Sequence, residues 1–172
     1  MEITDRQKVY IFIVGGRGMN DKPVDLLNRV RDILDKMKLN YAFREDIQTF
    51  IIPFGFETSR GKVRANILVK ASGNWVFTIA PLLNIKHIPR DSDKLKLYER
   101  LLMDTYYLNE VTYGLTRNGD IVVHAETHKD ALTPENFEVE FYSVVYGIKY
   151  FIDKIMPEFM EYEEKTYLQY IH

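Results

Sequence analysis

Trp75-Val76-Phe77-Thr78-Ile79-Ala80 decides the fold, because large and small side chains alternate along this stretch. Successive residues of a β-strand point to opposite faces of a sheet, so the alternation predicts a strand. We expect Trp75, Phe77 and Ile79 to lie together on the face that packs against the core. The rest of the chain is predicted to add strands to this sheet or to lay helices on it.

The next segments predict a helix followed by a hairpin. A charged helix is expected from about Asp93 to Asn109. Residues 111–116 and 121–125 then alternate again, and Asn118-Gly119 lies between them. This dipeptide is a strong signal for a type I′ turn, in which both central residues need a positive φ. The inward stripe predicted for the helix is Tyr98, Leu101, Leu102, Thr105 and Leu108.

Two amphipathic helices are predicted at the ends of the folded region. One runs from about Pro23 to Lys38. The other is capped by Thr133, has Pro134 at its first position and ends at Pro157. Apolar residues recur along it at helical spacing. Its predicted core stripe is Phe137, Phe141, Val144, Val145, Ile148, Phe151, Ile152 and Ile155.

Residues 49–56 and 64–71 also alternate and complete the predicted sheet. The predicted class is α+β: a single five-stranded antiparallel sheet with helices mainly on one face, in the order helix, three strands, helix, hairpin, helix. The residues predicted to form the centre of the core are Trp75, Phe77, Leu101, Phe141 and Ile148. The opposite face is predicted to show Ile51, Leu68, Lys70, Val76, Thr78, Thr112, Val122, His124 and Glu126.

Length and composition indicate one globular domain over residues 1–172. Within it we distinguish an N-terminal strand and Gly-rich connector (1–20), the core (21–156) and a C-terminal tail (157–172). The net charge is −2, and Lys and Arg are scattered, which argues against a nucleic-acid partner. Abundant Lys, Glu, Ile and Tyr without Cys would suit a thermophile.

The absence of Cys excludes disulfides, thiolate catalysis and Cys-ligated metals. The longest apolar run, Val9–Val14, is too short to span a membrane and lacks a signal-peptide cleavage site. We therefore predict a cytoplasmic location and no membrane partner. His124 and His128 are too far apart along a strand to bind one metal ion without help. No metal, cofactor or catalytic residue is predicted.

Gly15-Gly16-Arg17-Gly18 follows a predicted strand and precedes a helix. Such a turn can hold a phosphate on its backbone N–H groups. The spacing fits neither GxGxxG nor GxxxxGK[ST], so a simple connector is the leading interpretation. A nucleotide or small-ligand site at this turn is the alternative.

The order of elements resembles the type III secretion chaperone-like fold, which includes the YbjN-like proteins and the Tir-chaperone class. The segments that carry the resemblance are Leu101–Asn109, Val111–Leu115, Ile121–Ala125 and Lys129–Glu135, within residues 24–156. The resemblance implies a non-enzymatic and commonly dimeric protein. It also implies that protein segments bind on the sheet and helix surfaces.

The last helix carries a second stripe, Val139, Tyr142, Tyr146 and Tyr150, about opposite the core stripe. A helix that is apolar on two sides is usually covered on both, here by the tail, the N-terminal segment or another copy of the chain. We predict a chaperone-like, protein-binding module without enzyme activity, with a protein partner or a second copy in a homodimer. The predicted partner-binding residues are Ile51, Leu68, Val76 and Val122. The predicted self-association residues are Tyr142, Tyr146 and Tyr150.

Overall fold

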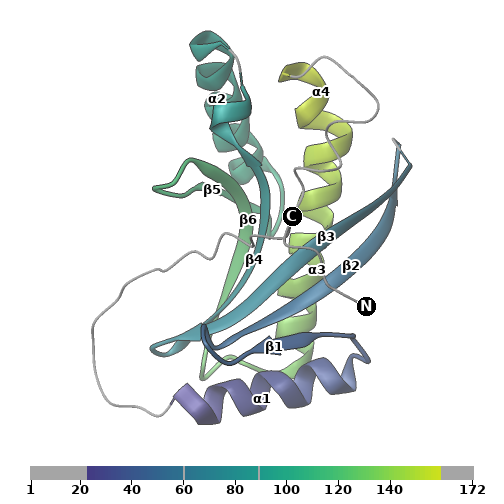
Figure 1. Ribbon diagram of the computed structural model, residues 1–172, viewed down its shortest axis with the longest axis vertical. Coiled ribbons are helices and arrows are strands. Elements are labelled where there is room, and N and C mark those ends of the chain that lie inside the picture. Colours follow the sequence, from purple (N-terminus) through teal and green to yellow (C-terminus); the bar gives the residue numbers. More distant parts are fainter. Residues whose placement is uncertain (1–22, 60, 89, 160–172) are drawn as a thin grey trace, which may run out of the picture.

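A computed structural model describes residues 23–59, 61–88 and 90–159 of the chain. One antiparallel sheet of six strands, in the order β1-β2-β3-β4-β6-β5, forms its centre (Figure 1). The strands are β1 (Ala42–Arg44), β2 (Thr49–Thr58), β3 (Gly61–Ser72), β4 (Trp75–Asn84), β5 (Thr112–Leu115) and β6 (Asp120–His128). The helices are α1 (Pro23–Lys36), the 3₁₀ turn η1 (Ile85–His87), α2 (Asp91–Tyr107), α3 (Pro134–Tyr150), the π-helical turn η2 (Phe151–Ile155) and α4 (Met156–Phe159).

The predicted α+β class is confirmed, with one strand more than expected. The additional strand is β1, which spans three residues and pairs with the start of β2. So short a segment has no alternation to recognise. The predicted N-terminal strand Val9–Val14 lies outside the described residues.

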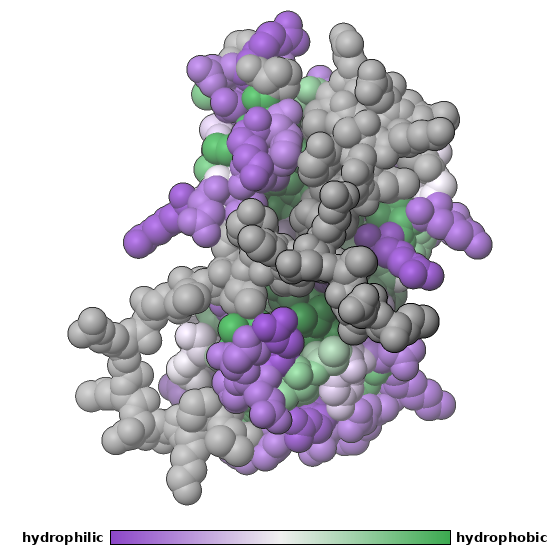
Figure 2. Space-filling model, viewed as in Figure 1, coloured by the Kyte–Doolittle hydropathy of each residue, from purple (hydrophilic) through white to green (hydrophobic). Residues whose placement is uncertain are grey.

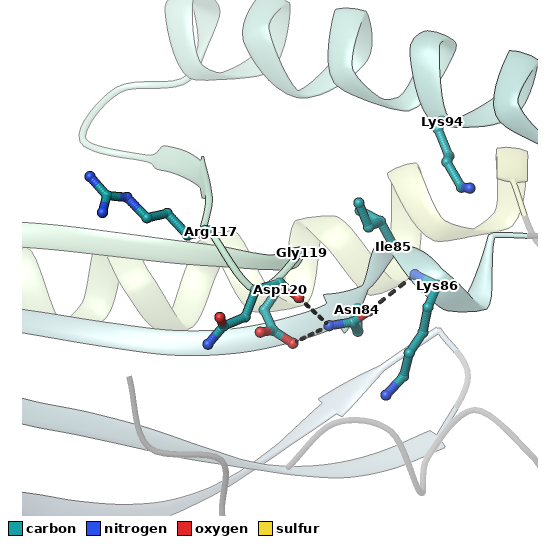
Figure 3. Close-up of a pocket in the computed structure, with 8 residues that line it drawn as sticks. Asn84, Ile85, Lys86, Lys94, Arg117, Gly119 and Asp120 are labelled. Carbon is teal, nitrogen blue, oxygen red and sulfur yellow. Dashed lines mark hydrogen bonds between the residues drawn. The ribbon is translucent and has the colours of Figure 1, made fainter. Parts of the chain in front are cut away.

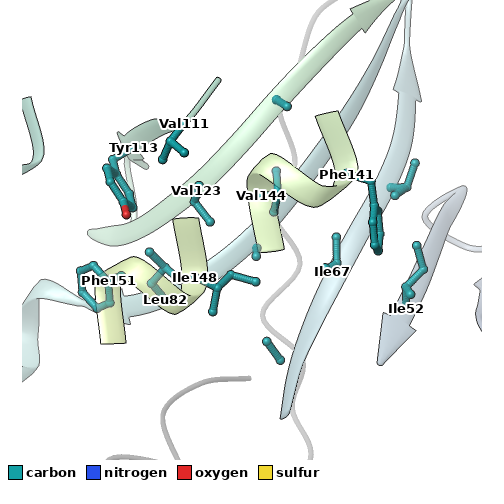
Figure 4. Packing of buried hydrophobic residues seen from close by; sticks show 14 of the residues in the cluster. Ile52, Ile67, Leu82, Val111, Tyr113, Val123, Phe141, Val144, Ile148 and Phe151 are labelled. Atoms are coloured by element: carbon teal, nitrogen blue, oxygen red, sulfur yellow. The ribbon is translucent and has the colours of Figure 1, made fainter. Parts of the chain in front are cut away.

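Helix α3 runs along one face of the sheet and supplies most of the core. Figure 4 shows Phe141, Val144 and Ile148 of this helix pointing toward side chains of the strands. All three are fully buried, as is Phe137 one turn earlier. The helix begins as predicted, because the Thr133 hydroxyl accepts a hydrogen bond from the Asn136 N–H.

The predicted end of this helix at Pro157 is wrong, because the helical path continues to Phe159. Proline lacks an N–H and its ring crowds the carbonyl four residues earlier. Here the helix widens from α to π geometry in η2. The Met156 N–H donates to the Phe151 carbonyl, five residues back. Pro157 then lies in the first turn of α4, a position that proline tolerates.

The two faces of β4 are the reverse of the prediction. Val76, Thr78 and Ala80 point to the core and are at most 2% exposed. Trp75 is 45% exposed, and Phe77 and Ile79 are half-buried on the other face. The register explains this, since Thr78 lies opposite Val69 of the core, whereas Ile79 lies opposite Leu68. The predictions that Trp75 and Phe77 are core residues are therefore wrong, while Leu101, Phe141 and Ile148 are buried as predicted.

The stripe predicted for α2 is also displaced around the helix. Leu97, Leu101 and Asp104 face inward, whereas Leu102 is 72% exposed. Arg100 fixes the helix by pairing with Asp104 and with Glu158 of α4.

The predicted β5–β6 hairpin is confirmed, but its turn is not type I′. The Gly119 N–H donates to the Thr116 carbonyl, and Gly119 alone in the turn has a positive φ, of 83°. This is a type I turn followed by a left-handed glycine.

Candidate protein-binding surface

The face of the sheet opposite α3 carries a row of side chains from five strands. Ile51 of β2 lies opposite Leu68 of β3, which lies opposite Ile79 of β4. Ile79 lies opposite His124 of β6, and His124 lies opposite Thr112 of β5. All five side chains are half-buried. The row is therefore apolar at β2 to β4 and polar at β6 and β5.

A second row lies beside the first, toward the β3–β4 turn. Lys70, Phe77 and Glu126 are direct cross-strand neighbours in it. Burial lowers the pKa of Lys70. His124 Nδ1 lies 2.9 Å from a Glu126 carboxylate oxygen, so the two rows are linked at β6. Phe77 thus lies between the Lys70 ammonium group and the Glu126 carboxylate, and Ile79 lies beside it in the first row, between Leu68 and His124.

Figure 2 looks onto this face, because β2 and β3 cross in front of α3 in the same view in Figure 1. Hydrophobic residues appear there between hydrophilic ones. A mixed surface of this kind suits a protein contact, since the apolar positions bury area and the polar positions fix orientation.

Three of the four predicted partner-binding residues lie on this face. Ile51 and Leu68 are half-buried, and Val122 is 5% exposed. Val76 lies on the opposite face with an exposure of 1%, so its predicted placement is wrong. The prediction missed Phe77 and Ile79 because the alternation of residues 75–80 was assigned to the wrong faces.

The tyrosine stripe of α3 is partly exposed. Tyr142 and Tyr146 are 44% and 50% exposed, and Val139 is 58% exposed. Tyr150 is half-buried, and Arg100 Nη2 lies 3.4 Å from its hydroxyl oxygen. Tyr142 also contacts the edge of the Phe54 ring, at a centroid distance of 6.4 Å. The stripe is therefore divided between intramolecular packing and open surface.

Helix α2 presents a more exposed apolar surface, which the sequence did not indicate. Leu102, Tyr106 and Tyr107 are 72%, 82% and 76% exposed. Leu95 and Met103 are also exposed on this helix. Figure 1 shows α2 at one end of the molecule, beyond β5. We call these five side chains the α2 surface.

An open pocket of about 710 Å³ lies where η1 meets the β5–β6 turn. Figure 3 shows the Asn84 amide at its centre, donating to the Asp120 carboxylate and to the Asn118 carbonyl. The Asn84 side-chain oxygen accepts from the Lys86 N–H. Lys94 and Arg117 also line the pocket. These hydrogen bonds join η1 to the β5–β6 turn. The side chains of Asn84 and Asp120 therefore have a structural role in this pocket.

A second pocket of about 440 Å³ lies at the other end of β6. Glu126, Thr127 and His128 line it from the strand, together with Trp75 of β4 and Val139 and Glu140 of α3. Within the described ranges, His, Asp and Glu side chains form no group suited to a metal ion. Across the same residues, no helix is long and apolar enough to cross a membrane.

The chain has the type III secretion chaperone-like fold, as its element order predicts. No protein-family model and no curated protein sequence matches it. The likeness is to solved structures. The chain is 16% identical to YbjN from E. coli over 73% of its own length and 90% of that chain, with a TM-score of 0.55.

Two further structures are similar at this level. One is an uncharacterised protein from Methanothermobacter thermautotrophicus, 11% identical over 77% of this chain and 98% of that one, with a TM-score of 0.51. The other is the HopA1–SchA chaperone–effector complex. This chain is 12% identical to the matched chain of that complex over 75% of its own length and 95% of the matched chain, with a TM-score of 0.50. These likenesses concern the fold. The Gly15–Gly18 turn lies outside the described residues.

Proposed function

We propose that this protein is a non-enzymatic, chaperone-like module that binds a segment of another polypeptide on the face of its sheet opposite α3. The observation that carries the proposal is the unbroken row Ile51, Leu68 and Ile79, flanked by Phe77. An amphipathic sheet usually has one buried face and one polar face. Here the face opposite α3 should be the polar one, but it is apolar at its centre.

Binding there would depend on both parts of the face. Phe77 and Ile79 would lose exposed apolar area on contact, at roughly 25 cal/mol per Å². Lys70 and Glu126 would fix the register of the bound segment through opposite charges. A half-buried and mixed surface favours a moderate, reversible contact over a permanent one. The HopA1–SchA complex, with its similar fold, is a chaperone bound to an effector, which supports the same interpretation.

The test places a photo-cross-linking amino acid at position 68 of the full chain in its source cells. A second protein carries it at position 154, because Lys154 is exposed on η2. We expect a polypeptide to be cross-linked from position 68 and not from position 154. Mass spectrometry identifies it, and calorimetry with the purified partner then measures its affinity.

The matched variant for calorimetry is Leu68→Thr with Ile79→Thr, which keeps β-propensity while removing apolar area. We expect a loss of affinity of at least about tenfold, which corresponds to about 1.4 kcal/mol. Equal affinity of the parent and the variant, with both folded by circular dichroism, would contradict the proposal. The cytoplasmic location belongs to this proposal, and cell fractionation checks it.

The alternative is a nucleotide or small-ligand protein that uses Gly15–Gly18. Calorimetry of the full chain against nucleotides separates it from the lead proposal. Binding that disappears when Gly15, Gly16 and Gly18 are all replaced by Ala would favour this alternative.

We also propose that the chain self-associates. The predicted stripe Tyr142, Tyr146 and Tyr150 is one candidate surface, and the α2 surface is the other. The greater exposure of Leu102 and Tyr106 favours the α2 surface, because exposed apolar side chains that cluster on one helix commonly mark an interface.

A further inference from the structure

Strand β6 has a free edge over its last residues. It spans Asp120–His128, but β5 pairs only with residues 121–124. On that side of β6, no strand among the described residues lies beside residues 125–128. Strand β4 pairs along the other side as far as His128. The backbone N–H and C=O groups of this edge are therefore a template for one more strand.

A groove lies along this free edge. It is the pocket of about 440 Å³, with β6 on one side and the first turns of α3 on the other. Its apolar surface includes Trp75, 45% exposed, and Val139, 58% exposed. The Asn136 amide donates to the Ala131 carbonyl at 2.9 Å and so fixes the end of the groove. An aromatic ring and a valine are thus exposed beside the free edge of β6.

The charge of the groove is negative. Glu110, Glu126 and Glu140 all line it. Glu126 has His124 as a partner, whereas neither Glu110 nor Glu140 forms an ion pair with a described residue. Burial, and then the carboxylates of Glu110 and Glu126, raise the pKa of Glu140. The carboxylates of Glu110 and Glu126 therefore repel that of Glu140, and a cation in the groove would relieve that repulsion.

We propose that this groove binds an extended polypeptide segment that carries Arg or Lys and adds to the free edge of β6 as a strand. The backbone of the segment would pair with residues 125–128, and its basic side chains would meet Glu110 and Glu140. A guanidinium group on the Trp75 ring would add a cation–π contact. The inference rests on the proposed protein-binding function, and assigns a second contact and its chemistry.

The probe is a short, fluorescent synthetic peptide of alternating Arg and Val, measured by anisotropy against the full chain. A peptide with Glu in place of each Arg is the control for charge. We expect saturable binding of the Arg peptide and none of the Glu peptide. Binding should weaken as the salt concentration rises, because Glu110 is exposed and Glu140 is only half-buried, so salt screens both charges.

The protein variant is Glu110→Gln with Glu140→Gln. Its matched control is Glu99→Gln with Glu138→Gln, which removes the same charge from exposed positions outside the groove. We expect the groove variant to lose at least about tenfold in affinity, because the basic side chains of the segment would lose their charged hydrogen-bond acceptors. The control should change affinity by less than about twofold. Equal effects of the two variants would overturn the proposal.

Strand addition has its own signature. In an added strand, alternate N–H groups point to the protein, so N-methylation of one alternate set should abolish binding and of the other set should spare it. Equal binding of the two methylated peptides would overturn the proposal. So would a second copy of this chain in the groove, revealed by a dimer that dissociates in the Glu110→Gln, Glu140→Gln variant. If only this inference is wrong, cross-linking from position 68 still succeeds; if the proposed function is wrong, that cross-linking fails.

Discussion

The Tyr113 hydroxyl donates a buried hydrogen bond of 2.8 Å to the Gly147 carbonyl, and thereby joins the edge strand β5 to the last turn of α3. Two further contacts hold the strand at this point. The Thr105 hydroxyl of α2 accepts from the Tyr113 N–H at 3.0 Å. Tyr113 lies opposite Val123 of β6. Strand β5 has only four residues, so these contacts to two helices fix its position.

Tyr113→Phe removes this hydrogen bond and should cost about 0.5–1.5 kcal/mol at neutral pH. Burial, and then the Asp104 carboxylate, raise the pKa of Tyr113, so its neutral form is favoured in the fold. That contribution is complete below the unfolded pKa of about 10 and is lost as the pH rises beyond it. The parent should therefore lose stability above pH 10 more steeply than the variant. Urea titrations of both proteins at a series of pH values measure this; parallel losses would contradict it.

Gly147→Ala should destabilise the protein although alanine favours a helix. A Cβ at this position would lie 2.5 Å from Val123 Cγ2 and 3.1 Å from Val111 Cγ1. The strain of overpacking, about 1–3 kcal/mol, exceeds the helix gain of about 1 kcal/mol. In a Val123→Ala background, the same change should be neutral or stabilising. A double-mutant cycle by urea unfolding measures the coupling, and strict additivity would contradict the packing argument.

Phe141→Ala should cost about 3–5 kcal/mol, because the ring is fully buried. It contacts the rings of Phe54 and Phe137 at centroid distances of 5.7 and 6.2 Å. Tyr142→Ala is the matched control one position along, where the side chain is 44% exposed, and it should cost less. Denaturant unfolding of the two variants checks the order. A loss below about 1 kcal/mol for Phe141→Ala would mean that its ring is not packed in the core.

The sequence predicted the α3 face correctly because the contrast there is large. Phe137, Phe141 and Ile148 recur at helical spacing with Glu138 and Glu140 between them. In β4, by contrast, Trp75, Phe77 and Ile79 alternate with Val76, Thr78 and Ala80, which are smaller but equally suited to a core. The larger side chains do not mark the covered face of a strand here. Helix α3 lies close to the sheet, which leaves room for small side chains on the covered face of this strand. The predicted binding residue Val76 was misplaced for the same reason.

The free edge of β6 could not be predicted for a different reason. It depends on where β5 ends relative to β6, and thus on tertiary pairing. Glu110 and Glu140 are 30 positions apart in the sequence, and only the packing of α3 beside β6 brings them to one groove. The α2 surface was missed because a helix with apolar residues on several sides has no clear inward stripe.

The reversed faces of β4 predict unequal losses of stability for two neighbouring changes. Trp75→Thr should cost about 1 kcal/mol or less, because the side chain is 45% exposed and contacts the edge of the His128 ring. Val76→Ala should cost about 2 kcal/mol, since two buried carbon atoms are lost and a cavity remains. Chemical denaturation of both variants measures the difference. A larger loss for Trp75→Thr would contradict the assigned faces.

The final prediction concerns self-association. Leu102→Gln with Tyr106→Gln should lower the solution mass of the full chain, because both side chains lie in the α2 surface and are more than two-thirds exposed. Glutamine keeps helix propensity, so α2 should stay folded. The comparison variant, Tyr142→Gln with Tyr146→Gln, tests the stripe of α3 in the same way. Sedimentation at several concentrations gives the mass, and circular dichroism confirms the fold. We expect only the α2 variant to become monomeric, because Tyr142 also packs against Phe54 within the chain. Dissociation of the α3 variant alone would assign self-association to the tyrosine stripe, and a monomeric parent would overturn both assignments.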